Sequence, residues 1–242
     1  MAKRVGLVLG LLLLVGAVHA QRAASAPQGT VKLDKATLSY AIGYQIGSQF
    51  ADGDPAVDLA TLQRAMGDAF AKRKPSVPPA QMRAQLHALE AHVHERALAE
   101  FKQIAAANAQ KSAQFMAQNR TRPGVVELPS GVQYAVIKRG DGGATPTVSS
   151  KVTVNYRGML IDGTEFDSTW ARGQPVSFQV NGVIPGWRDV IPRMHVGDRW
   201  KVVIPPKLAY GERGALPRIG PNEALVFEIL GDRVGARIEG AL

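Results

Sequence analysis

Residues 152–168 read VTVNYRGMLIDGTEFDS, and this stretch decides the fold class of the second half of the chain. Valine and threonine alternate at its start, as in a strand with one buried face, so residues 151–157 are predicted to form a β-strand. A short helix is expected around residues 186–194. Four more segments have β-branched or alternating character and are separated by Gly or Pro clusters: 133–138, 176–180, 199–205 and 225–230. The pattern predicts an α+β domain with a mostly antiparallel sheet over residues 121–242.

The sequence upstream of this domain is helical, and residues 34–75 are predicted to form two short helices. Asp34 and Asp58 are expected to cap them, because an aspartate oxygen accepts hydrogen bonds from the first free N–H groups of a helix. Apolar residues recur every three or four positions: Leu38, Ile42, Ile46 and Phe50 in the first helix, and Leu59, Leu62, Met66 and Phe70 in the second. Two helices of this size do not form a stable core alone. They need a partner surface, which is either the rest of the chain or a second copy of it.

Residues 76–120 are predicted to form one long helix. After Pro79 the segment contains neither Gly nor Pro, and strong helix formers dominate it. As a single helix it would be about 60 Å long. An apolar stripe through Met82, Leu86 and Val93 weakens into Ala and Gln after Ile104. A helix that is polar on most of its circumference favours a strut between domains, and the alternative is a helix folded back onto a bundle.

The first 20 residues have the layout of a secretory signal peptide. A positive start at Lys3 and Arg4 is followed by an apolar run over residues 5–18, and Ala20 offers a small residue for cleavage. The run is short for a membrane span, and a retained N-terminal anchor is the alternative. Residues 21–33 are small and polar, which predicts a flexible leader. We therefore expect an exported protein that is soluble after cleavage near Ala20.

The composition excludes several kinds of site. The chain has no cysteine, so it forms no disulfide, thiolate metal site or thiol nucleophile. Its net charge is +9, and removal of Lys3 and Arg4 leaves 27 − 20 = +7. The longest basic run is residues 72–74 without interleaved aromatic residues, so we expect a solvated basic face and no nucleic-acid partner. His92 and His94 point about 200° apart on a helix and cannot share an ion, so we expect neither a metal nor a cofactor.

Several separated motifs of the C-terminal half occur together in one order. They are VTVNYRGMLIDGTEFDS at 152–168, VIPGW at 183–187, MHVGD at 194–198, IP at 204–205, LAYGERG at 208–214 and ALVFE at 224–228. Over about residues 124–233 this ordered set resembles the FKBP-type peptidyl-prolyl cis-trans isomerases. The resemblance implies an antiparallel sheet wrapped around a short helix, with an aromatic pocket between them.

The upstream part resembles one branch of that family, the periplasmic and dimeric macrophage infectivity potentiator-like proteins. The matching stretches are SYAIGYQIG at 39–47 and LPSGVQY at 128–134. The resemblance implies that residues 34–75 form a helical dimerisation domain, which interlaces with that of a second chain in a homodimer. The long helix of residues 76–120 would then carry each isomerase domain outward, and the periplasm would be the location.

By motif position the resemblance also implies the residues of the pocket. Trp187 would be its floor, under the proline ring. The walls and lining would be Tyr156, Phe166, Phe227, Phe178, Val183 and Ile219. The backbone amide of Ile184 and the hydroxyl of Tyr210 would donate hydrogen bonds to substrate carbonyls, and Asp167 would lie at the rim. The alternatives are core packing for the aromatic residues and turn capping with Ser168 for Asp167.

The reaction implied is rotation about an X-Pro amide, whose barrier is about 18–20 kcal/mol. A water-poor aromatic pocket that fits the twisted amide lowers this barrier without a nucleophile, metal or cofactor. The expected substrates are proline-containing unfolded polypeptides, and macrolide inhibitors are expected to bind in the same pocket. The alternative is a dimeric chaperone that holds unfolded chains, with incidental catalysis. Arg218 and Gly220 depart from the family pattern, which bears on substrate preference and loop stiffness.

Overall fold

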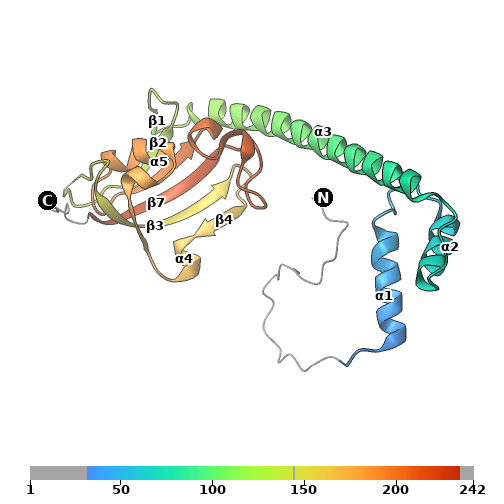
Figure 1. The fold of residues 1–242 in the computed structure, drawn as a ribbon. Helices are drawn as coiled ribbons and strands as arrows, with labels where there is room; N and C mark the ends of the chain where they lie inside the picture. Colours follow the sequence, from blue (N-terminus) through green and yellow to red (C-terminus); the bar gives the residue numbers. More distant parts are fainter. Residues whose placement is uncertain (1–31, 144, 235–242) are drawn as a thin grey trace, which may run out of the picture. The chain divides into compact units, whose positions relative to one another are not determined.

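The computed structural model describes residues 32–143 and 145–234. The predicted signal peptide and nearly all of the predicted leader lie outside these residues. The chain divides into two compact units, Met1–Ala97 and Leu98–Leu242, which are described separately below (Figure 1). None of the described helices combines the length and the apolar character that a membrane span requires.

The N-terminal unit is helical, as predicted. It contains α1 (Lys35–Ser48), α2 (Leu59–Phe70) and the first part of α3 (Pro79–Asn119). The Asp34 carboxylate accepts the Thr37 backbone N–H at 2.8 Å, and the Asp58 carboxylate accepts that of Thr61 at 2.7 Å. Both predicted N-caps are therefore confirmed. No residue of α1 or α2, which the structure describes in full, is buried.

A polar cluster joins the loop after α1 to the first part of α3. The Asp54 carboxylate contacts His92 Nε2 and Arg96 Nη1, each at 2.8 Å. The hydrogen bond from His92 is the main cause of a lowered Asp54 pKa. The exposed ring of His92 therefore faces a carboxylate. Among the described residues, no three His, Asp or Glu side chains gather in a way that would hold a metal ion.

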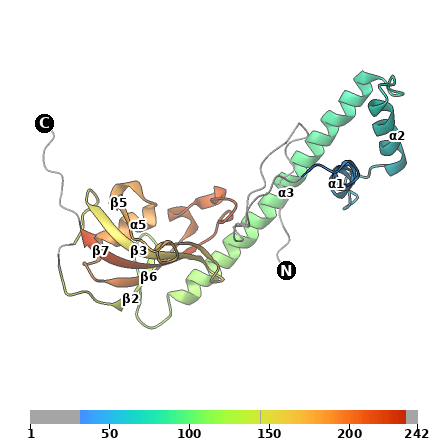
Figure 2. The same ribbon diagram turned by 90° about the horizontal axis from the view of Figure 1, so that it is seen from below.

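The C-terminal unit is built on one antiparallel sheet, which has seven strands among the described residues. The strand order is β1-β2-β6-β7-β3-β4, and β5 pairs with the same edge of β3 as β4 does. Figure 2 labels the strands β2, β3, β5, β6 and β7 of this sheet. The strands are β1 (Val125–Glu127), β2 (Gln133–Lys138), β3 (Lys151–Leu160), β4 (Glu165–Ser168), β5 (Val176–Gln179), β6 (Arg199–Ile204) and β7 (Leu225–Val234). The five predicted strands are all present, and the α+β class is confirmed.

Several short elements of this unit were missed. They are the strands β1 and β4, the helix α4 (Thr169–Arg172), and the 3-10 turns Val180–Gly182, Pro206–Leu208 and Gly211–Arg213. The expected helix at 186–194 is α5 (Pro185–Val190) followed by the 3-10 turn Ile191–Arg193. Elements of three or four residues are too short to show a period, and pairing along β3 rather than local pattern stabilises β4.

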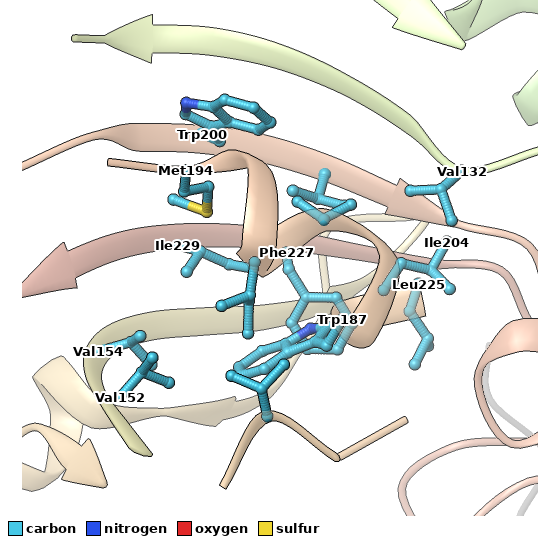
Figure 3. Close-up of a cluster of buried hydrophobic side chains, with 14 of the residues drawn as sticks. Val132, Val152, Val154, Trp187, Met194, Trp200, Ile204, Leu225, Phe227 and Ile229 are labelled. Atoms are coloured by element: carbon cyan, nitrogen blue, oxygen red, sulfur yellow. The ribbon is translucent and has the colours of Figure 1, made fainter. Parts of the chain in front are cut away.

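The core of the C-terminal unit lies between the sheet and α5. Figure 3 shows Trp187 of α5 among side chains of β3, β6 and β7, including Val154, Ile204, Phe227 and Ile229. Ile204 and Ile229 are fully buried, as inward-facing positions of a sheet with one covered face should be. This core holds the helix and the sheet together without a disulfide.

The last part of α3, residues 98–119, packs within the C-terminal unit. The Asn119 side chain donates to Gln133 Oε1 of β2 at 2.8 Å, and Gln133 Nε2 donates to the Met116 carbonyl at 2.9 Å. Asn119 and Gln133 are both buried. The apolar stripe weakens after Ile104 because small and hydrogen-bonding side chains contact the sheet there. The expectation of a strut over residues 76–120 therefore does not describe residues 98–119.

Candidate functional site

Trp187 stands at the centre of an aromatic cluster because of the way α5 begins. Pro185 occupies the first turn of the helix, where its missing N–H costs nothing. Gly186 then lets the helix lie directly on β6, since a Cβ at that position would be 2.4 Å from Ile204 Cγ2. The indole is thereby pressed onto the sheet and is only 5% exposed. The Trp187 indole N–H is buried and has no hydrogen-bond partner among the described residues.

Three aromatic rings surround this indole. The ring centroids of Tyr156, Phe227 and Phe178 lie 5.1, 5.2 and 5.4 Å from that of Trp187. The Tyr156 and Phe227 rings meet it edge to face, an arrangement that aromatic pairs favour. Phe166 extends the cluster, with its ring centroid 5.8 Å from that of Phe227. The structure therefore brings the predicted floor and walls into one contiguous group.

Gly158 of β3 makes room for this group. A Cβ there would be 2.6 Å from Phe166 Cζ and 2.9 Å from Phe227 Cε1. Any side chain at residue 158 would therefore push the two phenylalanine rings apart. This glycine was not among the residues predicted from the sequence, although it lies within residues 152–168.

The other predicted lining residues have different degrees of burial. Ile219 is buried in the same core, and Val183 and Ile184 are half-buried against it. No described residue accepts a hydrogen bond from the Ile184 backbone N–H. The Tyr210 side chain is 42% exposed and belongs to none of the ring pairs that make up the cluster. The cluster thus forms without Tyr210.

Asp167 of β4 belongs to a polar network at the edge of the cluster. The Tyr156 hydroxyl donates to Asp167 Oδ2, and Arg172 Nη1 donates to Asp167 Oδ1. The Arg172 guanidinium carbon also lies 5.8 Å from the centroid of the Tyr156 ring. Burial acts to raise the pKa of Asp167, but these two hydrogen bonds and the arginine charge outweigh it and hold the pKa below its ordinary value. The carboxylate is therefore ionised at neutral pH.

Short-range structure brings this network together. The Ser168 hydroxyl accepts the Ala171 N–H at 3.3 Å and caps α4, so Ser168 rather than Asp167 is the capping residue. Helix α4 is one turn long, so its last residue, Arg172, lies close enough to Asp167 to donate a hydrogen bond to it. The Thr169 hydroxyl accepts the Tyr156 N–H at 2.8 Å and ties α4 to β3. Sequence reasoning missed Arg172; the signal available was Ser168 at a helix start and Gly173, with its positive φ of 73°, at the end.

Two hollows of the C-terminal unit lie away from the aromatic cluster. One is lined by residues including Val152, Met194 and His195. The other, of about 390 Å³, lies between α3 and the sheet and is lined by residues including Met116, Gln133 and Pro205. Neither has the aromatic lining expected for a proline ring.

Comparisons with known proteins assign the chain to a family. The family model described as FKBP-type peptidyl-prolyl cis-trans isomerase matches residues 142–230. A second model, described as the domain amino terminal to FKBP-type peptidyl-prolyl isomerase, matches residues 35–136. The peptidyl-prolyl cis-trans isomerase Mip of Coxiella burnetii is 41% identical over 199 residues, which cover 82% of this chain and 86% of that protein. The chain belongs to the FKBP-type peptidyl-prolyl cis-trans isomerases.

Further relatives match over most of the chain. An outer membrane protein MIP of Legionella longbeachae is 38% identical, covering 89% of this isomerase and 92% of that protein. The crystal structure of FkpA from Escherichia coli matches with a TM-score of 0.68 and 36% identity, over 84% of this chain and 97% of that one. The FKBP-like fold expected from the sequence motifs is thereby confirmed, together with the helical N-terminal part.

Proposed function

We propose that the aromatic cluster around Trp187 is the prolyl site of this isomerase. The observation that carries the proposal is the contiguity of the cluster, in which rings from β3, β5 and β7 surround the indole of α5 and Phe166 of β4 extends the group. A proline ring is apolar and compact, and an aromatic surface with little water suits it. The proposed substrates are proline-containing unfolded polypeptides.

The proposed roles follow from position. The half-buried side chains Val183 and Ile184 border the cluster, and the Ile184 N–H is proposed to donate to a substrate carbonyl. The exposed Tyr210 hydroxyl is proposed to donate to a second one. The water-poor surface over Trp187 would favour the twisted amide, which has less charge separation than the planar one. Asp167 would hold Tyr156 and Arg172 in place at the rim, and macrolide inhibitors would occupy the same surface.

We further propose that the protein is a homodimer through α1 and α2. Leu59, Tyr40 and Phe70 are 60%, 74% and 94% exposed, and the two helices bury none of their own residues. An uncovered apolar surface of this kind marks an interaction site. A second copy is the proposed occupant because these helices need a partner surface and belong to a region that recurs in FkpA-like relatives.

An exported location, in the periplasm, is part of the same proposal. It is supported by the signal-peptide pattern of residues 1–20 and by a relative whose name places it in the outer membrane. A chaperone activity on unfolded chains would accompany catalysis. The competing function is a dimeric chaperone with incidental catalysis, which the exposed apolar residues of α1 and α2 favour.

The experiment compares prolyl exchange with holding activity in the purified mature chain. Asp167→Ala should slow cis–trans exchange of a short X-Pro peptide, measured by NMR exchange spectroscopy, by about tenfold or more. Asp162→Ala, in an exposed turn, is the matched control and should match the parent. Suppression of aggregation of an unfolded protein should be the same in all three. Parental exchange rates in Asp167→Ala would reject the proposed site. A parent chain without exchange activity would reject the isomerase function and leave the chaperone function as the only one supported.

A further inference from the structure

The segment of residues 210–224 carries two proposed site residues, Tyr210 and Ile219. Within it, Ala215 and Ile219 pair with each other through backbone hydrogen bonds of 2.8 and 3.1 Å. The Gly214 N–H donates to the Tyr210 carbonyl at 3.2 Å. These bonds shape the segment internally. They do not attach it to the rest of the domain.

Arg218 Nη1 attaches the segment to β4 by donating to the Phe166 carbonyl at 3.0 Å, and helix α3 supplies a second attachment from outside the site. The Ser112 hydroxyl donates to the Asn222 carbonyl at 2.9 Å and accepts the Ala224 N–H at 2.8 Å. The Asn108 side-chain amide donates to the Pro221 carbonyl at 2.9 Å. Ser112 and Ala224 are both buried, so water does not replace these bonds when they are lost. The end of the segment is thus held by polar side chains on one face of α3.

Asn222 connects these contacts to Tyr210. Its backbone N–H donates to the carbonyl of Gly211, the residue after Tyr210, at 2.8 Å. Its side-chain amide donates back to the Ala105 carbonyl of α3 at 3.3 Å. Its φ is +56°, in the left-handed region that non-glycine residues adopt only when their surroundings hold them there. Three hydrogen bonds, two of them to α3, fix this conformation.

Gly220, a departure from the family pattern, lies next to Asn108 of α3. A Cβ at residue 220 would be 3.0 Å from Asn108 Nδ2. A larger residue there would displace Asn108 from the Pro221 carbonyl. The neighbouring Ile219 packs in the core against the aromatic cluster, one residue away from this contact.

We propose that Asn108 and Ser112 of α3 are positioning residues for catalysis, which act through Asn222 to hold Tyr210 and Ile219 at the prolyl site. The inference rests on the proposed site, and it assigns to the end of the long helix a part in the reaction. Without the hydrogen bonds from Asn108 and Ser112, the segment of residues 210–224 would adopt its substrate-binding conformation for only a fraction of the time. Substrate affinity would fall by that fraction, while saturating substrate would restore full turnover.

The test is the kinetics of the full mature chain with Ser112→Ala and with the milder Asn108→Ala, on a short X-Pro peptide. KM should rise by about fivefold in Ser112→Ala, with kcat close to that of the parent. A loss of folded protein would instead lower kcat and leave KM unchanged. Gln114→Ala, on an exposed position of the same helix, is the matched control and should have parental constants.

Amide hydrogen exchange gives a second measure that does not depend on activity. The Ile219 N–H should exchange faster in both variants, whereas that of Ile229, in the central strand β7, should keep its parental protection. Ser112→Thr, which retains the hydroxyl, should restore the parental rate at Ile219. Parental KM and parental Ile219 exchange in folded Ser112→Ala and Asn108→Ala would overturn the positioning role. If the parent chain itself has no isomerase activity, the proposal of a prolyl site around Trp187 is rejected instead.

Discussion

The two units of this chain bury their apolar residues to very different degrees. In the C-terminal unit, inward-facing residues such as Val202 and Ile229 are fully buried between the sheet and α5. In α1 and α2, which are equally regular and correctly capped, no residue is buried. Regular secondary structure is therefore present in both units, but only the C-terminal unit buries its apolar residues. The C-terminal unit therefore has a core within one chain, whereas α1 and α2 leave their apolar residues exposed, which is why a second copy is proposed as their partner.

The first way to test this comparison is to remove a methyl-rich side chain from each unit. Ile229→Ala should lower the free energy of unfolding of the C-terminal unit by about 2–5 kcal/mol, because it leaves a cavity in a packed core. Ile42→Ala, at a half-exposed position of α1, should change that transition by less than about 0.5 kcal/mol.

Denaturant unfolding followed by tryptophan fluorescence measures both, since Trp170, Trp187 and Trp200 all lie in the C-terminal unit. Similar losses in the two variants would show that the apolar face of α1 is as well packed as the core of the sheet.

A second prediction concerns the space above Gly158. Gly158→Ala should destabilise the C-terminal unit by about 1–3 kcal/mol, since the new Cβ forces the Phe166 and Phe227 rings to move. It should also slow prolyl exchange, because those rings are proposed walls of the site. Gly182→Ala is the control, as nothing lies within 4 Å of a Cβ there. Unchanged stability in Gly158→Ala would mean that the rings do not close over residue 158.

A third prediction concerns how the free energy of unfolding of the C-terminal unit falls at acid pH. The folded-state pKa of Asp167 is held below its ordinary value, so its ionised form stabilises the unit at neutral pH, and the contribution is lost as the pH falls through the lowered pKa. Arg172→Ala removes one cause of the lowering, so the stabilisation should be smaller in the variant and its loss should be complete at a higher pH than in the parent. The midpoint of unfolding, measured by tryptophan fluorescence between about pH 3 and pH 7, follows this change. Superimposable pH profiles would show that Arg172 does not act on Asp167.

The smallest effect on the C-terminal unit is expected from Phe70→Glu. This residue is 94% exposed in the single chain, so its replacement should not alter the fluorescence transition. A charge at a dimer contact should nevertheless halve the mass measured by light scattering at micromolar concentration. The replacement Lys72→Glu, at an exposed residue nearby in the sequence, should leave the dimer intact. A parent chain that is already a monomer would remove the dimer proposal.

Local chemistry explains which parts of the fold were predictable. The caps at Asp34 and Asp58 depend on atoms three residues apart, and the alternation of Lys151–Leu160 reflects one buried face, so both can be read from neighbouring residues. The motif order correctly assigned the family, and the structure gathers Tyr156, Phe178, Trp187 and Phe227 as expected.

What the sequence did not reveal depends on contacts across the fold. The packing of residues 98–119 in the C-terminal unit rests on Ser112, Asn119 and their partners about 110 and 14 residues away, and a polar residue on a helix gives no sign of such a partner. Arg172 was missed because α4 has only four residues, so that its return to Asp167 has no periodic signature. Tyr210 was grouped with the pocket, and the structure leaves its side chain 42% exposed, unlike the buried Trp187 and Phe227.

The most direct test of the account is the rate of cis–trans exchange of a short X-Pro peptide with the parent chain, Trp187→Leu and Trp170→Leu. Trp187→Leu keeps an apolar residue on α5 but removes the indole, and its kcat/KM should fall by about tenfold or more, which corresponds to at least ~1.4 kcal/mol of transition-state stabilisation. Trp170→Leu, at an exposed position of α4, should keep the parental rate. Folded Trp187→Leu with parental kcat/KM would contradict the claim that this indole is the floor of the prolyl site.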